Sequence, residues 1–371
     1  MAVKEKKLVK QLPKYKAAKS IESVCREFGF QEKDIIKLAG NENRYGCSPK
    51  VIEALSRQAS SFSFYPDVNV TVLRHKLAEK HQVSPEKLVF GNGSFELISL
   101  VGAAYIEEGD EVIYNDPSFG WYLNVTKQNG GKLIRVPVDE EKRVDTDQIV
   151  AHITEKTKVI WLCNPNNPTG TVLSFSVLED LIRQVPERVL VVLDEAYIDF
   201  IQGGYPDTER FVQTYDNVIL LRTFSKVYGL ASFRIGYGIG NEKIVEALTK
   251  VKLPLNVSNA AQIAAVAALE DQQFTDFIVK TNQQELAYYY EEFAKLGLHY
   301  IESNGNFVLV KIGIDSAFAE LAFLKRGIVI RNGEEFGLPG WLRISVGRIE
   351  ENRKVIEVLK EVLKEGLQYV H

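Results

Sequence analysis

The amino-acid sequence predicts an α/β protein with a mostly parallel sheet, followed by a smaller α+β domain. Three observations predict this fold class. From about residue 85, short β-branched runs alternate with longer amphipathic stretches, which is the pattern of strands joined by crossover helices. Several of the short runs end in a polar or glycine-containing turn. After about residue 256 the alternation stops and a long helical stretch begins.

The candidate strands of the sheet are short and rich in apolar residues. Seven are expected, at residues 87–90, 111–114, 132–136, 158–162, 189–193, 218–221 and 235–239. The turns GNGS, NDPS, CNPNNPTG, DEAY and RTFSK follow five of them. Because open parallel sheets bind ligands at the carboxyl ends of their strands, we expect the chemistry of the protein in these turns.

The C-terminal part of the chain is expected to form a second domain. A helical stretch from about residue 259 to 295 precedes strand-like NFVLVKI, helix-like AFAELAFLKR, two short strands around Val329 and Ile344, and a helix from about Glu350. At roughly 100–200 residues per domain, 371 residues suit two domains. We expect an N-terminal arm and small-domain segment at 1–44, a large domain at 45–257 and a small domain at 258–371.

Composition and charge exclude several classes of protein. Charged residues make up 25% of the chain and hydrophobic ones 45%, which is typical of globular proteins and not of disordered, collagen-like or coiled-coil chains. The net charge of −4 provides no basic field for nucleic acid or anionic lipid, so small molecules are the expected partners. Residues 1–19 hold seven lysines, but Leu8, Leu12 and Tyr15 interrupt the charge, so we interpret them as a solvated arm and not as a nucleic-acid arm.

The cysteines, histidines and N-terminus indicate a cytoplasmic protein without a metal. Three scattered cysteines suit free thiols in a reducing compartment. Neither a secretory signal nor an apolar stretch long enough for a bilayer is evident. None of the five histidines has the spacing of a metal site.

The turn GNGSFE, residues 91–96, is a candidate phosphate site. It joins a predicted strand to a predicted helix, and the backbone N–H groups and dipole of a helix N-terminus favour an anion. Glu96 stands where a dinucleotide fingerprint has its third glycine, and no strand-end acid follows at the required distance. We therefore expect no NAD site, and the absence of G-x-x-x-x-G-K-[ST] in the sequence also excludes a P-loop.

Asp194 and Lys226 are the candidate chemical groups. Asp194 is the last residue of an apolar strand, where burying a carboxylate costs desolvation energy unless a cation or a hydrogen bond compensates for it. Asp194 is therefore either a functional carboxylate or a helix N-cap. Lys226 follows another strand among Thr223, Ser225 and Arg234. A lysine buried near an arginine loses proton affinity and becomes a nucleophile, whereas the alternative is an ordinary surface lysine.

A lysine amine, a buried acid and a phosphate cup are together what pyridoxal 5′-phosphate requires. At these residues the sequence resembles the fold-type I aminotransferases that use this cofactor, and within them the histidinol-phosphate aminotransferase family. The resemblance runs through essentially the whole chain. It is carried by LAGNENRYGCSP (38–49), YPD (65–67), GNGSFELI (91–98), CNPNNPTGT (163–171), VVLDEAYIDF (191–200), RTFSKVYGLASFRIGYG (222–238) and LRISVG (342–347).

The resemblance implies a role for each matching residue. Lys226 would bind the cofactor covalently and act with Asp194 and Tyr197 in catalysis, Asp194 at the ring nitrogen. The residues that would hold the cofactor are Ser94, Phe95, Phe119, Asn167, Asp194, Tyr197, Thr223, Ser225, Lys226 and Arg234, with Tyr65 reaching the phosphate in the neighbouring subunit of a homodimer. The substrate would be bound by Arg343 at its carboxylate, by Asn167, and by Arg331 and Tyr15 at a distal phosphate or carboxylate.

The sequence departs from the family pattern at three positions. Arg44 replaces the proline of NENP, Phe95 replaces an acid, and Lys14 replaces the proline that commonly precedes the tyrosine matched to Tyr15. A backbone contact survives any side chain, so phosphate binding by residue 95 need not suffer. The first two departures bear on substrate choice or cofactor affinity, and the third weakens the match of Tyr15.

The reaction that the resemblance implies is transamination between L-histidinol phosphate and 2-oxoglutarate, which gives imidazole acetol phosphate and L-glutamate in histidine biosynthesis. An aromatic amino-acid aminotransferase and a threonine-phosphate decarboxylase stay open as alternatives, because Arg343 and Arg331 suit their substrates too. A non-catalytic regulator that binds the cofactor is a more remote alternative. Such regulators usually carry an appended DNA-binding domain, and only about forty residues precede the first motif.

Overall fold

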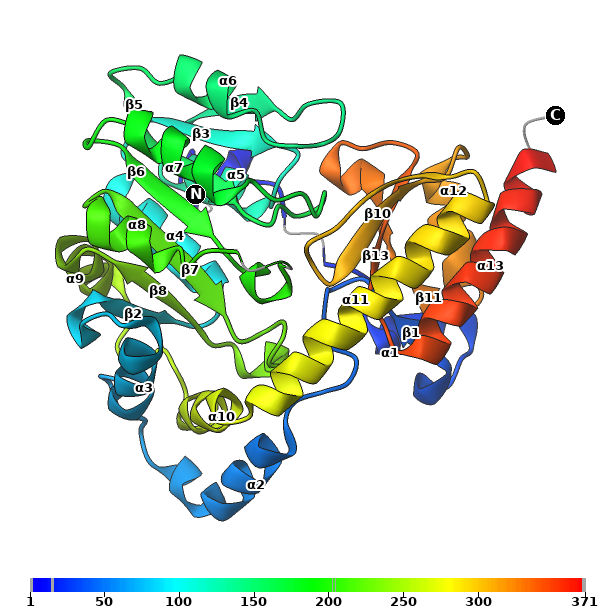
Figure 1. Ribbon diagram of the computed structural model, residues 1–371, viewed down its shortest axis with the longest axis horizontal. Coiled ribbons are helices and arrows are strands. Elements are labelled where there is room, and N and C mark those ends of the chain that lie inside the picture. Colours follow the sequence, from blue (N-terminus) through cyan, green and yellow to red (C-terminus); the bar gives the residue numbers. More distant parts are fainter. Residues whose placement is uncertain (1–2, 15–16, 202, 204, 369–371) are drawn as a thin grey trace.

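The computed structural model describes residues 3–14, 17–201, 203 and 205–368 (Figure 1). Figure 1 shows a larger lobe around a central sheet and a smaller lobe that holds both ends of α13, with the long helix α11 running from one lobe to the other. Within the described residues, no helix is long and apolar enough to cross a membrane.

The larger lobe is built on a sheet of seven strands. In spatial order these are β2 (Leu88–Gly91), β8 (Gly236–Gly240), β7 (Val218–Thr223), β6 (Leu190–Asp194), β5 (Thr157–Cys163), β3 (Glu111–Asp116) and β4 (Lys132–Pro137). All run in one direction except β8, which is antiparallel to both of its neighbours. The predicted α/β class and its seven strands are therefore confirmed.

Helices cover both faces of this sheet, because its strands are apolar on both sides. In β5, Ile160 and Leu162 pack into one hydrophobic cluster while Val159 and Trp161 pack into the other. The first cluster includes side chains of α2 (Pro49–Arg57), α3 (Thr71–His81), α6 (Thr146–Ala151), α7 (Phe175–Gln184), α8 (Glu209–Thr214) and α10 (Asn259–Leu269). The second includes α4 (Ser94–Tyr105), α5 (Trp121–Gln128) and α9 (Glu242–Val251).

The smaller lobe contains an antiparallel sheet. Its strands follow the order β12 (Arg331–Asn332), β13 (Trp341–Ser345), β10 (Phe307–Lys311) and β9 (His299–Ile301). They pack with α11 (Gln272–Lys295), α12 (Ser316–Leu324) and α13 (Ile349–Gln368) around a separate core. Near the N-terminus, α1 (Ile21–Phe28) precedes β1 (Ile36–Lys37), which pairs in parallel with β11 (Ile328–Val329).

Short 3₁₀ helices complete the described elements. They are η1 (Val9–Gln11), η2 (Glu32–Asp34), η3 (Ala59–Ser63), η4 (Pro85–Lys87), η5 (Ile198–Phe200), η6 (Ala231–Phe233) and η7 (Gly333–Phe336). Two of them, η5 and η7, lie in connections that matter for the site.

The expected continuous helix from about 259 to 295 is wrong in one respect, because it is two helices. The Asp271 side chain accepts a hydrogen bond from the Phe274 backbone N–H at 3.3 Å and so caps the start of α11. Helix α10 buries its alanines in the core of the larger lobe, whereas Tyr289 and Phe293 of α11 belong to the core of the smaller lobe. The divisions at residues 44 and 257 stay predictions.

Candidate active site

A cavity of about 370 Å³ opens at the carboxyl ends of β5, β6 and β7, facing the start of α4. This is the edge of the sheet at which the sequence predicts a ligand. The sequence-predicted residues that line it are Ser94, Phe95, Phe119, Asn167, Asp194, Tyr197, Thr223, Ser225, Lys226 and Arg234. Strands and turns far apart in the sequence thus bring ten of these residues to one cavity.

Lys226 follows β7 and is partly buried, so the alternative of an ordinary surface lysine is excluded. Its Nζ donates a hydrogen bond to the Gly40 carbonyl oxygen at 3.1 Å and lies 5.4 Å from the centre of the Tyr197 ring. Burial, followed by the positive charge of Arg343, lowers the pKa of Lys226 to about 8. About a tenth of the amine is therefore unprotonated and nucleophilic at pH 7, whereas an ordinary lysine is almost fully protonated there.

Asp194 is the last residue of β6 and only 3% exposed. Its Oδ2 accepts a hydrogen bond from the Tyr122 hydroxyl at 2.6 Å, and its Oδ1 accepts one from the Ala196 N–H at 3.2 Å. Burial raises the pKa of Asp194, while the Tyr122 hydrogen bond acts in the opposite direction. The carboxylate starts no α-helix, so it does not serve as the N-cap that was the alternative interpretation.

The start of α4 forms one side of an anion cup. Gly93 precedes this helix with a φ of +74°, and Ser94 and Phe95 occupy the first turn, where backbone N–H groups are free of intrahelical partners. A Cβ at Gly93 would lie 2.3 Å from Nη2 of Arg234. The glycine is thus required for close approach of the guanidinium as well as for its φ.

Hydroxyl groups complete the cup. Thr223 Oγ1 donates to Ser225 Oγ at 3.0 Å, and Nη1 of Arg234 lies 3.5 Å from the same oxygen as a donor. A guanidinium, two hydroxyls and a helix N-terminus converge here, which is the chemistry that binds phosphate.

The opposite wall of the cavity carries amide and phenol groups. Tyr197 Oη accepts hydrogen bonds from Asn41 Nδ2 at 2.9 Å and from Asn167 Nδ2 at 3.4 Å. Asn41 belongs to the motif LAGNENRYG but was not among the predicted site residues. Tyr122 was missed in the same way, although it lies in DPSFGWY beside Phe119.

Phe95 and Phe119 form an aromatic wall. Their ring centres are 5.0 Å apart in an edge-to-face arrangement, and the Phe95 ring also lies 5.5 Å from that of Trp121. Where the family pattern has an acid, this chain therefore adds apolar surface beside the cavity.

Arg343 of β13 joins the smaller lobe to the site. It is 6% exposed, and its Nη1 donates to Asn167 Oδ1 at 2.6 Å while its Nη2 donates to the Ala39 carbonyl oxygen at 2.8 Å. Arg331 is its cross-strand partner in β12. Arg343 thus contacts a cavity residue directly, and Arg331 lies beside it.

One predicted residue lies away from the cavity, and another is not described by the structure. Tyr65 follows η3 on the surface and is 87% exposed, so its contact with a neighbouring subunit stays a prediction. Tyr15 lies outside the described residues.

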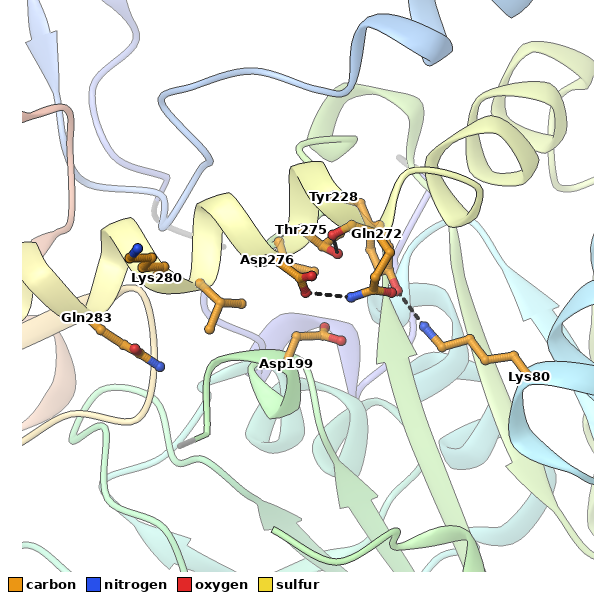
Figure 2. Close-up of a pocket in the computed structure, with 10 residues that line it drawn as sticks. Lys80, Asp199, Tyr228, Gln272, Thr275, Asp276, Lys280 and Gln283 are labelled. Atoms are coloured by element: carbon orange, nitrogen blue, oxygen red, sulfur yellow. Dashed lines mark hydrogen bonds between the residues drawn. The ribbon is translucent and has the colours of Figure 1, made fainter. Parts of the chain in front are cut away.

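Two further cavities flank the connection between β6 and α8. Figure 2 shows the first, of about 290 Å³, in which Lys80 Nζ donates to Tyr228 Oη at 2.9 Å and Gln272 Nε2 donates to Asp276 Oδ1 at 2.8 Å. The second, of about 460 Å³, shares Lys80 and Asp199 with it. Neither is lined by a residue predicted to carry chemistry. Among the residues that the structure describes, no cluster of three or more His, Cys, Asp or Glu side chains could hold a metal ion.

Comparison with known proteins identifies the family to which this chain belongs. The model of the family "Aminotransferase class I and II" matches residues 33–359, and the chain therefore belongs to this family. Within it, the chain is 41% identical to the histidinol-phosphate aminotransferase of Caldicellulosiruptor saccharolyticus, over 96% of this chain and 99% of that protein. The enzyme of the same name from Halalkalibacterium halodurans is also 41% identical, over 97% of each chain. The resemblance predicted from the motifs is confirmed.

Solved structures agree with the fold. The histidinol-phosphate aminotransferase of Sinorhizobium meliloti, solved in complex with pyridoxal 5′-phosphate, superposes with a TM-score of 0.89 at 27% identity, covering 98% of this chain and 99% of that one. An aspartate aminotransferase from Thermus thermophilus gives a TM-score of 0.86 at 25% identity, covering 97% and 100%.

The cavity of this chain fits pyridoxal 5′-phosphate by its own chemistry. Lys226 offers an amine with a lowered pKa to a carbonyl group, and the anion cup offers donors to a phosphate. The hydrogen bonds to Asp194 come from neutral donors, so its negative charge is available to pair with a protonated ring nitrogen. The donor set thus matches the three polar parts of the cofactor.

Proposed function

We propose that this chain is a pyridoxal 5′-phosphate-dependent aminotransferase that converts L-histidinol phosphate and 2-oxoglutarate into imidazole acetol phosphate and L-glutamate, in histidine biosynthesis. The observation that carries the proposal is the meeting of Lys226, Asp194 and an anion cup in one cavity. The names of the curated relatives support the choice of donor.

When bound, the cofactor would supply an electron sink for loss of a proton from the amine-bearing carbon of the donor. Lys226 would hold the cofactor covalently, and its Nζ, when free, would serve as the general base that takes the proton from that carbon. A pKa of about 8 suits this role, because the amine is then basic enough to accept the proton and is not fully protonated beforehand.

The other residues hold the cofactor in register with Lys226. Asp194, Tyr197, Asn167 and Phe119 all line the cavity. Asp194 would hold a negative charge for the ring nitrogen, Tyr197 and Asn167 would offer hydrogen bonds to the ring hydroxyl, and Phe119 would offer its ring to a face of the cofactor. We assign phosphate binding to the backbone N–H groups of Ser94 and Phe95 and to the side chains of Thr223, Ser225 and Arg234.

The substrate groups are assigned to the smaller lobe. Arg343 binds a carboxylate such as that of the keto acid, because a guanidinium matches a carboxylate with two parallel hydrogen bonds. Asn167 is hydrogen-bonded to Arg343 and would contact the same ligand from the larger lobe. Arg331 and Tyr15 are assigned to the distal phosphate of the donor.

We also infer a cytoplasmic homodimer. Phe64 and Tyr65 are 74% and 87% exposed, and such exposed apolar surface between η3 and α3 supports docking of a second copy that places Tyr65 at the neighbouring cofactor phosphate. Light scattering tests the dimer, and Tyr65→Ala is expected to weaken cofactor binding at the same oligomeric state. The three free cysteines support the cytoplasm as the compartment.

One observation favours aromatic amino acids as a second class of donor. Arg331 is already ion-paired with Glu335, so the side chain assigned to the distal phosphate is not an unoccupied cation. A donor with a neutral distal ring therefore leaves no unpaired charge behind.

The visible spectrum of the purified protein tests the proposal, with donors added one at a time and no keto acid present. We expect L-histidinol phosphate to abolish the band of the covalently bound cofactor at far lower concentration than L-phenylalanine does. Faster loss with phenylalanine would make aromatic transamination the main activity. A protein without any such band after addition of the cofactor would contradict the cofactor assignment.

A pair of lysine variants adds a control. Lys226→Ala is expected to lose the covalent band and all turnover, because it removes the amine. Lys80→Ala also removes a lysine whose pKa is lowered by burial, but outside the active-site cavity, and we expect it to retain both.

A further inference from the structure

Two arginines lie opposite each other in the small sheet. Arg331 of β12 is the register partner of Arg343 of β13, and the ring of Phe336 lies under both guanidinium groups, at 5.5 and 5.0 Å from ring centre to Cζ. Like charges in opposite positions of a strand pair repel. The environment of each arginine must therefore offset this repulsion.

Different groups offset the positive charge of each arginine. Arg343 donates to the neutral oxygens of Asn167 and Ala39, whereas Arg331 forms an ion pair with the carboxylate of Glu335, the penultimate residue of η7. The side chains of Arg331 and Glu335 are 12% and 27% exposed, so this pair is screened less than a surface pair.

The ion pair with Glu335 does not use every hydrogen-bond donor of Arg331. Its Nε is buried and has no hydrogen-bond partner within the part of the chain that the structure describes. A second acid, Glu320, lies near, but burial and the charge of Glu335 raise its pKa and bias it toward the neutral form. Glu335 is thus the anion that occupies the outer face of the Arg331 guanidinium group, and the unpartnered Nε shows that this pair does not use every donor of the arginine.

We propose that Glu335 determines donor specificity: its carboxylate occupies the anion position on Arg331, gives way to the distal phosphate of one donor, and stays in place when the distal group of the donor is uncharged. The inference rests on the proposed function and refines it. Because Glu335 is partly exposed at the end of a short helix, its carboxylate reaches water when displaced. Arg331 then keeps a counter-charge with either class of donor, which avoids the cost of a buried unpaired cation.

Glu335→Gln removes the competing charge and keeps the side-chain shape. We expect the half-saturating concentration of L-histidinol phosphate to fall about fivefold, and that of L-phenylalanine to rise by a similar factor, since a partly buried ion pair contributes on the order of this factor. The maximal rate of the half-reaction is expected to change little with either donor, because Glu335 does not line the reaction cavity.

Glu334→Gln is the matched control. Glu334 precedes Glu335 in η7 and accepts a hydrogen bond from Ser316 Oγ at 3.3 Å, without a contact to Arg331 among its described interactions. We expect its donor preference to equal that of the wild type. Equal shifts for both donors, or the same effect from Glu334→Gln and Glu335→Gln, would overturn the proposal.

Inorganic phosphate provides a second readout. In the cofactor-loaded enzyme it should inhibit the reaction with phenylalanine more strongly in Glu335→Gln than in the wild type, and unchanged inhibition would count against the displacement of Glu335. If the variant fails to fold, Glu335→Asp takes its place, with shifts in the same direction because the shorter side chain pairs less well. A wild type that does not react with histidinol phosphate would instead refute the proposed function, whatever Glu335 does.

Discussion

At the scale of single residues, the site depends on what surrounds two ionisable groups. Lys226 is an amine kept from full protonation by burial and by Arg343, and Asp194 is a carboxylate kept in place by Tyr122. Residue type alone decides neither property. The same lysine in water would be protonated throughout the physiological range.

The lowered pKa of Lys226 makes the stability of the cofactor-free protein depend on pH. The folded state has a pKa of about 8 against an ordinary value of 10.5, so the unfolded chain binds this proton more tightly. Protonation of the buried lysine lowers the free energy of unfolding. This effect has its full size below pH 8 and disappears as the pH rises toward 10.5. We expect Lys226→Met to be more stable than the wild type, with a difference that is largest at pH 7 and shrinks by pH 10.

Urea unfolding of both cofactor-free proteins at pH 7, 8, 9 and 10 measures this difference. Comparing the two proteins removes the contributions of tyrosines and cysteines that titrate in the same range. A stability difference that did not vary with pH would mean that Lys226 keeps its ordinary pKa.

At the scale of elements, the cup at the start of α4 depends on one glycine. Gly93→Ala would strain a residue with a φ of +74° and bring its Cβ within 2.3 Å of Arg234 Nη2. We expect a loss of about 1 kcal/mol in the free energy of unfolding from the backbone, and weaker cofactor binding from the displaced guanidinium.

Gly109→Ala separates the two effects. Gly109 has a φ of +95°, but no atom lies within 4 Å of its Cβ position, so this variant carries the strain without the collision. A titration of cofactor-free protein with pyridoxal 5′-phosphate should show weakened binding for Gly93→Ala alone. Equal affinity in both variants would contradict the assignment of Arg234 to the cup.

The elements also show which parts of the fold a sequence reveals. All seven strands of the large sheet were predictable, because most are runs of apolar residues buried on both faces; the edge strand β4 is exposed at Lys132 and Arg135 but still carries the run Leu133, Ile134 and Val136. The two-residue strand β1 and the three-residue strand β9 were not, since so short a segment has no periodicity of its own. The break at Asp271 was missed because its flanking residues continue a helical pattern, and only the capping hydrogen bond reveals it.

The candidate site divides in a similar way. Residues in motifs at strand ends, such as Lys226 and Asp194, could be named from the sequence. The hydrogen bonds of Asn41 to Tyr197 and of Tyr122 to Asp194 join residues 156 and 72 positions apart. Such pairs are products of tertiary packing, and local pattern carries no signal for them.

At the scale of the whole molecule, an ion pair ties the segment between the lobes to α13. Arg44, which replaces a proline of the family pattern, donates from Nε to Glu351 Oε1 at 3.0 Å, and Arg348 Nε donates to the Arg44 carbonyl oxygen at 2.9 Å. We expect Arg44→Ala to lower the free energy of unfolding by about 1 kcal/mol, since both partners are partly buried.

Arg57→Ala is the control for this prediction. Arg57 pairs with Glu53 one helical turn away, and both side chains are more than half exposed, so its loss should change stability little. Denaturant unfolding of the two variants tests the contrast. Equal losses would mean that the Arg44 pair contributes no more than a surface pair.

The hydrogen bond between Arg343 and Asn167 also bears on how the protein could be redesigned. It joins the antiparallel sheet of the smaller lobe to the loop after β5 in the larger one, so the substrate-binding surface proposed above draws on both lobes. A chimera that exchanged the smaller lobe for that of a relative would have to reproduce the register of β13 on β10, because a shift of one residue points the guanidinium away from Asn167. Grafting a new specificity onto this scaffold is therefore a problem of strand alignment before it is a problem of side-chain choice.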